Sequence, residues 1–183
     1  MRYFSPHSAE EAVEALASGP FTILAGGTDV YPSLRDRPAP ADILDISRIA
    51  ELRGIEHSGD CWRFGATTTW TSVARAKLPP AFHGLQAAAR EVGSAQIQNA
   101  GTIAGNICNA SPAADGVPPL LSLDARVEIL SPQGRRTVPL SDFIKGVRSI
   151  DLHPGELVTA ILIPDIDARS AFAAEAAARA PEV

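Results

Sequence analysis

Apolar and polar positions in the first part of this chain form short blocks separated by glycine and proline. Ser8 precedes the first block and Glu11 follows three residues later, which is the capping-box signature of a helix start. Apolar residues at positions 12, 13, 16 and 17 then share one face, and Gly19-Pro20 ends the block. The pattern predicts an amphipathic helix between Ser8 and Gly19.

The next blocks predict a strand, a helix and a second strand. The run Phe21 to Ala25 is short and apolar and leads into two glycines, so we expect a buried strand. We expect a short helix over Val30 to Arg35 and another strand over Ile43 to Ile46. The order strand, glycine loop, helix, strand is typical of a small parallel βαβ unit.

After residues 55–60 the pattern becomes mixed. It predicts strands over 61–66, 126–130, 134–140 and 157–163, helices over 69–77 and 80–92, and a helical turn over 120–123. The turn residues 131–134 predict that two of these strands form a hairpin. We therefore expect an α+β protein with a small parallel lobe (1–57) and a larger mixed, mainly antiparallel lobe (58–165). Residues 166–183 are expected to be a terminal helix or the truncated start of a further domain.

The segment Gln96 to Asp115 departs from these patterns. It gathers small residues, amides and hydroxyls, and it reads neither as an ordinary helix nor as an ordinary strand. Short polar side chains and glycine allow a backbone to come close to a ligand. The run is therefore interpreted as shaped around a polar ligand, with an irregular, turn-rich loop as the alternative.

A strand that runs into paired glycines offers a second place for a ligand. Backbone N–H groups at such a turn are free to bind an anion, and Thr28 can cap the helix or donate to phosphate. A tight turn without a ligand is the alternative. In the polar run, Thr102, Gly105 and Asn106 can form another cradle, and Asp115 suits sugar hydroxyls or serves as a turn or N-cap residue.

The composition of the chain argues against nucleic-acid binding and membrane insertion. The chain has 183 residues, 45% of them hydrophobic, and a net charge of −5, so it carries no electrostatic footprint for nucleic acid. It contains no run of about 18 apolar residues, so no membrane insertion is predicted. The first ten residues do not resemble a signal peptide, and a cytoplasmic protein is expected.

The side chains that commonly carry catalysis are sparse. Two cysteines are too few for an iron–sulfur cluster, which usually needs four ligands. Cys61 is expected to fill space in a strand, and Cys108 either lines a site or is simply a small buried residue. The four histidines lie apart in loops or at helix edges, and no metal site is predicted. Two polar cradles without an acid–base set indicate that a bound cofactor carries the chemistry.

At this point the motifs resemble a known family. The chain is similar to the FAD-binding (medium) subunit of molybdenum hydroxylases, the xanthine dehydrogenase and aerobic carbon monoxide dehydrogenase family. The likeness extends over about residues 1–164, in matching order and spacing. It rests on Ala25-Gly26-Gly27-Thr28-Asp29, Gly93-Ser94-Ala95-Gln96-Ile97-Gln98-Asn99, Thr102-Ile103-Ala104-Gly105-Asn106 and Ala110-Ser111-Pro112-Ala113-Ala114-Asp115, with support from Asp45-Ile46-Ser47-Arg48, Gly65-Ala66-Thr67-Thr68, Leu121-Ser122-Leu123-Asp124-Ala125 and Pro154-Gly155-Glu156-Leu157.

The resemblance implies a flavoprotein fold of the vanillyl-alcohol-oxidase (PCMH) type, with FAD between the two lobes. It implies a diphosphate-binding segment made of Ile23, Leu24, Ala25, Gly26, Gly27, Thr28, Asp29 and Val30. It implies a second contact loop made of Thr102, Ile103, Ala104, Gly105 and Asn106. Asp115 would then contact the adenosine end or sugar hydroxyls, and Leu152 would pack near the flavin.

The resemblance also implies a role in electron transfer. The flavin would receive electrons from [2Fe–2S] clusters on one partner chain, while a second partner with a molybdopterin cofactor would oxidise the substrate. Two alternatives remain open. One is a truncated or degenerate assembly module with weak or no FAD binding, and the other is a stand-alone flavin reductase of the same fold.

Two departures from the family pattern motivate the assembly-module alternative. Ala104 replaces one of two consecutive glycines that the family usually carries, and its methyl group is either tolerated or crowds the cofactor if that backbone needs a positive φ. The C-terminal domain that usually follows is not present before Val183.

Overall fold

The computed structural model describes residues 2–34 and 42–165, and it begins with a small parallel sheet. This sheet has the order β1-β3-β2. Its strands are β1 (Arg2–Phe4), β2 (Thr22–Leu24) and β3 (Asp42–Asp45), and β3 pairs in parallel with both neighbours. Helix α2 (Val30–Leu34) lies between β2 and β3 in sequence, so the predicted βαβ unit is confirmed.

Helix α1 (Ala9–Ala17) starts where the capping box predicts. The Ser8 hydroxyl accepts a hydrogen bond from the Glu11 N–H at 3.2 Å. The Glu11 carboxylate accepts from the His7 N–H at 2.9 Å, one residue earlier than in the usual box. Ala12 and Val13 are buried, so the predicted apolar face packs inward.

A five-stranded antiparallel sheet forms the second lobe, in the order β4-β5-β10-β6-β7. Its strands are β4 (Ile55–Ser58), β5 (Cys61–Gly65), β6 (Arg126–Ser131), β7 (Gly134–Pro139) and β10 (Leu157–Pro164). The β6–β7 hairpin is confirmed, with Ser131 paired to Gly134 across the turn. The central strand β10 is interrupted by a bulge between Val158 and Ala160.

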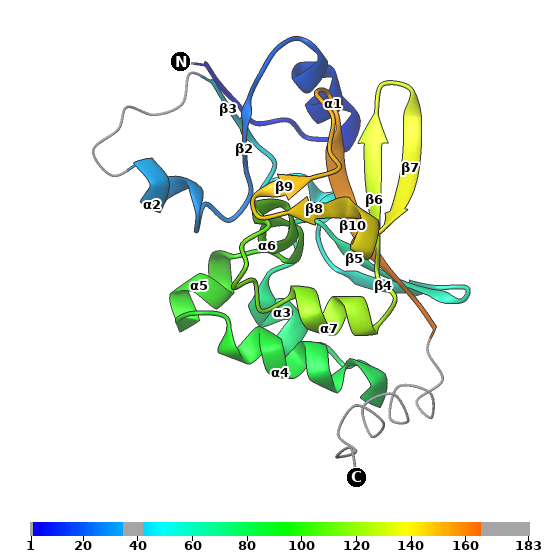
Figure 1. The fold of residues 1–183 in the computed structure, drawn as a ribbon. Helices are drawn as coiled ribbons and strands as arrows, with labels where there is room; N and C mark the ends of the chain where they lie inside the picture. Colours follow the sequence, from blue (N-terminus) through cyan, green and yellow to red (C-terminus); the bar gives the residue numbers. More distant parts are fainter. Residues whose placement is uncertain (1, 35–41, 166–183) are drawn as a thin grey trace.

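Short helices cover one side of this sheet, as Figure 1 shows for α3, α4, α5 and α7. The helices are α3 (Trp70–Arg75), α4 (His83–Glu91), α5 (Ala95–Ala100), α6 (Ile103–Asn109), α7 (Val117–Ser122) and α8 (Leu140–Phe143). Two 3₁₀ turns (Ala50–Leu52 and Pro80–Phe82) and a small hairpin of β8 (Ile144–Gly146) and β9 (Ser149–Ile150) complete the fold. No helix in the described ranges is long and apolar enough to cross a membrane.

Two interpretations of the sequence were wrong. The run from Gln96 to Asp115 does contain ordinary helix, because most of it forms α5 and α6, and its alternative reading as an irregular loop fails with it. Ser94 and Thr102 supply the N-caps, and these hydroxyls accept from Ile97 and Gly105 N–H groups. His57 lies in strand β4 rather than in a loop or at a helix edge.

Several short elements carried no pattern that predicted them. Strand β1 has three exposed residues and β4 has only one side chain that is not exposed, so neither shows an inward-facing period. The β8–β9 hairpin is equally short. Arg35 of the predicted second helix and the expected C-terminal element 166–183 lie outside the described residues.

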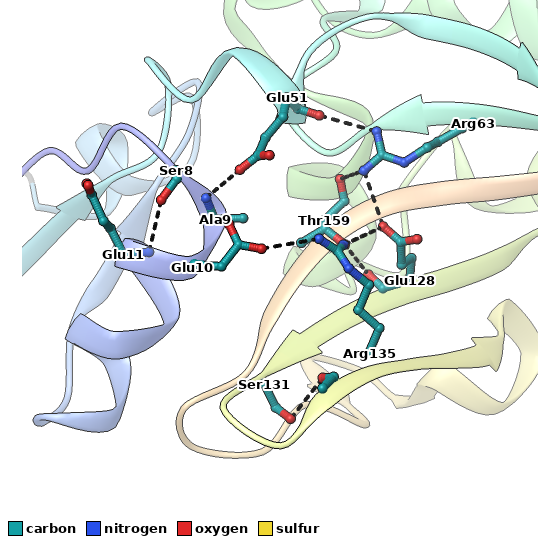
Figure 2. Close-up of polar contacts among 11 residues, drawn as sticks. Ser8, Ala9, Glu10, Glu11, Glu51, Arg63, Glu128, Ser131, Arg135 and Thr159 are labelled. Carbon is teal, nitrogen blue, oxygen red and sulfur yellow. Dashed lines mark hydrogen bonds and ion pairs between the residues drawn. The ribbon is translucent and has the colours of Figure 1, made fainter.

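The two sheets share a hydrophobic cluster. Leu44 and Ile46 of the first lobe pack in the same buried cluster as Leu130 of β6 and Leu157 of β10. A polar chain reinforces this junction, as Figure 2 shows. Its contacts link Glu10 to Arg135 (3.5 Å), Arg135 to Glu128 (3.2 Å), Arg63 to Glu128 (3.2 Å) and the Thr159 hydroxyl to Glu128 (2.7 Å). Helix α1 is thereby tied to the second sheet.

Candidate cofactor site

A cavity of about 380 Å³ lies where the parallel sheet meets the helices and strand β10. Its volume is in the range typical of small-molecule and cofactor sites, roughly 300–1,000 Å³. Its wall includes most of the residues that the sequence nominated: Ile23, Ala25, Gly26, Gly27, Thr28, Asp29, Val30, Thr102, Ala104, Gly105, Asn106 and Leu152. Segments almost eighty residues apart in sequence therefore meet at one site.

The β2–α2 loop presents a run of backbone N–H groups to this cavity. Among the described residues, the amides from Gly26 to Val30 donate to no protein acceptor. The loop carbonyls are used, because Gly27 and Asp29 accept from Tyr31 and Ser33. Consecutive unpartnered amides beside a cavity form an anion-binding concavity.

Gly26 is required at this position by close backbone contact. A Cβ atom on Gly26 would overlap the carbonyl oxygen of Ala100 at the end of α5. The β2–α2 loop can therefore lie directly against the α5–α6 junction only because position 26 has no side chain. Gly27 is required for a different reason, since its φ of +70° is a left-handed conformation that glycine adopts without strain.

The opposite wall comes from the start of α6. The Thr102 hydroxyl caps the helix at the Gly105 N–H (3.1 Å), and the Ile103 N–H donates to the Thr68 carbonyl (2.9 Å). The side-chain oxygen of Asn106 is buried and has no hydrogen-bond partner within the described residues. A buried polar atom without a partner is costly in a folded protein. This oxygen lies beside Gly116, where an added Cβ would come within 2.9 Å of it.

The rest of the wall is mostly apolar, with Asn109 as its polar member. It comprises Ile46, Ala66, Trp70, Val92, Ile97, Gly101, Cys108, Asn109, Leu157 and Val158. Of these residues the sequence pointed only to Cys108, for which a place in a site was one of two readings. Most of these are ordinary core residue types in elements predicted for other reasons. Those that lie outside the polar run from Gln96 to Asp115 carried no local signal that marks a cavity wall.

Polar contacts join the mouth of the cavity to the β8–β9 hairpin. Asn109 donates from its amide to Asp29 at 2.8 Å, which links α6 to the glycine loop. Arg148, between β8 and β9, donates its backbone N–H to the Ala110 carbonyl at 2.9 Å and its guanidinium to Asn109. Asp29, Asn109 and Arg148 thus connect three segments around one opening.

Three nominated residues do not line the cavity. Leu24 and Ile103 are buried and point into the protein core. Asp115 is exposed, beside Gly116, whose Cα lies so close to Trp70 that a Cβ there would overlap the indole. Cys108 does line the cavity, and burial raises the pKa of its thiol to about 12, so it stays protonated at neutral pH.

A comparison with known families now gives this geometry a context. Residues 1–166 match the model of the FAD binding domain in molybdopterin dehydrogenase. The chain belongs to this family. It is 38% identical over 170 residues to the xanthine dehydrogenase FAD-binding subunit of Escherichia coli O157:H7, covering 88% of the chain and 57% of the relative. It is 36% identical over 179 residues to the nicotinate dehydrogenase FAD-subunit of Eubacterium barkeri, covering 93% and 60%.

A solved structure agrees with this assignment. The fold matches a carbon monoxide dehydrogenase from Hydrogenophaga pseudoflava, in a form that lacks the Mo-pyranopterin moiety, with a TM-score of 0.84 and 31% identity. The match covers 92% of this chain and 60% of that chain. The chain spans less than two thirds of the length of these relatives. The α+β flavoprotein fold and its cofactor, FAD, agree with the sequence prediction.

The described residues suit FAD, the cofactor of this family. FAD combines a doubly charged diphosphate with a flat, largely apolar ring system. The unpartnered loop amides suit the diphosphate, and the apolar wall around Trp70 and Leu152 suits a ring. In the described part of the chain, no group of three His, Cys, Asp or Glu side chains is arranged to hold a metal ion.

Ala104 does not strain the α6 backbone. It lies inside the helix, and its φ is not positive. The described non-glycine residues with a positive φ are Ala110, Asp124 and Arg148. Replacing Ala104 with glycine is therefore expected to lower helix stability by about 0.5–1 kcal/mol. We expect FAD affinity to change less than about fourfold, the equivalent of one buried methyl group at about 0.8 kcal/mol. A flavin-fluorescence titration and thermal melting check both values, and a tenfold gain in affinity would show that the methyl crowds the cofactor.

Proposed function

We propose that this chain is the FAD-binding electron-transfer subunit of a molybdenum-containing hydroxylase. In this proposal it takes electrons from [2Fe–2S] clusters on a partner chain and passes them through FAD to an acceptor. The observation that carries the proposal is the unpartnered amide run from Gly26 to Val30, which faces an apolar cavity between two lobes. Family membership supports the same reading.

Each nominated residue has a role in this proposal. The amides of 26–30 and the Thr28 hydroxyl bind the diphosphate, and Ile23, Leu24, Ala25 and Asp29 hold that loop in shape. Thr102, Ile103, Ala104, Gly105 and Asn106 form the second contact segment. Asp115, at the edge of the site, binds sugar hydroxyls at the adenosine end, and Leu152 excludes water from the flavin.

The composition of the wall supports electron transfer rather than catalysis by side chains. When bound, FAD supplies the capacity to take up and release electrons, which amino-acid side chains lack. Within the described residues, the wall offers Asp29 and Cys108 as its ionisable side chains, and the Cys108 thiol stays protonated. A stand-alone reductase would need a positioned proton donor, and these two groups do not form an acid–base pair.

The number of cysteines bears on where the iron–sulfur clusters of this proposal lie. An iron–sulfur cluster usually takes four cysteine ligands, and this chain has two, one in β5 and one in α6. We assign the clusters, and the molybdenum cofactor that acts on the substrate, to other chains. The names of the relatives, which describe FAD-binding subunits of dehydrogenases, support this division of labour.

The proposal is tested on the purified chain by its visible spectrum. We expect flavin bands near about 370 and 450 nm that bleach reversibly with a reductant, and release of FAD on denaturation. A folded chain that stays colourless after FAD is added would refute autonomous FAD binding and favour the assembly-module alternative. Bound FMN or riboflavin in place of FAD would contradict a diphosphate site in the glycine loop.

A further inference from the structure

Arg136 of strand β7 makes several side-chain hydrogen bonds to the loop that carries Leu152. Its Nε and Nη2 atoms donate to the two carboxylate oxygens of Glu156 at 2.8 and 2.7 Å. Its Nη1 donates to the Asp151 carboxylate at 2.8 Å, and Nη2 also donates to the Asp151 backbone carbonyl at 2.8 Å. One guanidinium therefore holds both ends of the segment 151–156. Arg136 itself does not line the cavity.

The loop is ordered around Leu152 by its own backbone contacts. The His153 N–H donates to the Glu156 carboxylate at 2.8 Å, and the Glu156 N–H donates to the His153 carbonyl at 3.1 Å. On the other side, the Asp151 N–H donates to the Phe143 carbonyl at 2.7 Å. Both chain neighbours of Leu152 are thus fixed, either directly by Arg136 or through Glu156.

The charges of these groups explain why an arginine is needed to hold the loop in this conformation. The hydrogen bonds from Arg136 lower the pKa values of the Glu156 and Asp151 carboxyls, so both stay ionised at neutral pH. The Glu156 side chain is only 10% exposed. Without the guanidinium, the Glu156 carboxylate would stay mostly buried without a cationic partner, and the loop would have to rearrange to expose it to solvent.

We infer that Arg136 is a positioning residue for the cofactor site, because it fixes Leu152 in the cavity wall through Asp151 and Glu156. The inference rests on the proposed function, since it treats the cavity as the FAD site. Arg136 acts on FAD binding without touching FAD. Its loss leaves the glycine loop and α6 intact but opens the wall at Leu152 to water.

The test compares R136Q, R136K, L152A and the double variant R136Q/L152A with the native chain. R135Q serves as the matched control. Arg135 directly precedes Arg136 in β7, but it pairs with Glu128 and Glu10 instead. Hydrogen–deuterium exchange of the chain without FAD reports on the loop directly. We expect R136Q to speed exchange of the amides between residues 151 and 157 by about tenfold or more, and R135Q to leave it unchanged.

FAD titration then measures the consequence for the site. R136Q is expected to raise the Kd for FAD by about tenfold, the scale of lost hydrogen bonds to charged groups. Because water would then reach the ring, the vibronic shoulders of the long-wavelength flavin band are expected to become less resolved. R136K is expected to restore only part of the loss, since an ammonium cannot make the paired contact with Glu156. In the L152A background, R136Q is expected to add less than about twofold, because both changes act through one contact.

Two results would overturn the inference. One is unchanged exchange of residues 151–157 in R136Q, and the other is a full tenfold loss on adding R136Q to L152A. Failure of the native chain to bind FAD would instead refute the proposed function. The exchange measurement would then still decide whether Arg136 holds Leu152 in place.

Discussion

Alanine at position 26 is expected to reduce FAD affinity by about 100-fold or more. The added methyl would overlap the Ala100 carbonyl, so the β2–α2 loop must move away from the α5–α6 junction. That movement misdirects the amides of residues 26–30, and losing two hydrogen bonds to a charged diphosphate, at about 1.5–3 kcal/mol each, accounts for the expected loss. Titration of the purified G26A variant with FAD measures it.

The matched control is G84A. Gly84 lies in α4, and a Cβ there would meet nothing within 4 Å. We expect G84A to keep native FAD affinity and to gain up to about 1 kcal/mol in stability, because alanine favours a helix more than glycine does. We expect G26A to lose about 1–3 kcal/mol of unfolding free energy through overpacking. Native FAD affinity in G26A would show that the cofactor does not depend on contact between the loop and α5.

Truncating Trp70 is expected to have the second largest effect. The indole is 1% exposed, lies against Gly116 and forms part of the cavity wall. The Trp70 backbone N–H donates to the Gly101 carbonyl at 3.1 Å, a contact that alanine would keep, so the expected loss comes from the indole alone. W70A is therefore expected to lower the unfolding free energy by about 3–5 kcal/mol. Urea unfolding followed by circular dichroism measures this loss.

W70A is also expected to weaken FAD binding in the molecules that remain folded. The loss should be about 10- to 100-fold, equivalent to the 1.5–3 kcal/mol gained by burying a large apolar side chain. W62A is the control, because Trp62 is half-buried on β5, stacks on His57 and does not line the cavity. We expect W62A to lose stability while keeping FAD affinity within about twofold. Equal losses of affinity in both variants would indicate a general effect of destabilisation instead.

The sequence was sufficient where a local rule acts over a few residues. Ser8 and Glu11 predicted the start of α1, and paired glycines after an apolar strand predicted the β2–α2 turn. Residues 131–134 predicted the β6–β7 hairpin. Each of these signals depends on backbone conformation within one turn, so it is readable without knowing the partners in the fold.

The same local reasoning failed where short polar residues serve two purposes. Asparagine, threonine and glycine are frequent in loops, so the run from Gln96 to Asp115 was not read as ordinary helix, and an irregular loop was the alternative to a ligand-shaped segment. In the structure, Ser94 and Thr102 use their hydroxyls as helix caps, and the run forms two short helices. Ile103 and Ile107, both fully buried, show the inward face of α6, which the surrounding small residues had concealed.

The sequence by itself determined the family, the α+β class and two polar segments that line the cavity. Only the tertiary structure decided what completes that cavity. Trp70, Val92 and Val158 carry no local signal that separates a cavity wall from a core, because burial in either environment favours the same apolar side chains. Likewise, nothing near Arg136 in sequence shows that it holds the Leu152 loop, since its contacts with Asp151 and Glu156 form only when β7 pairs in the sheet.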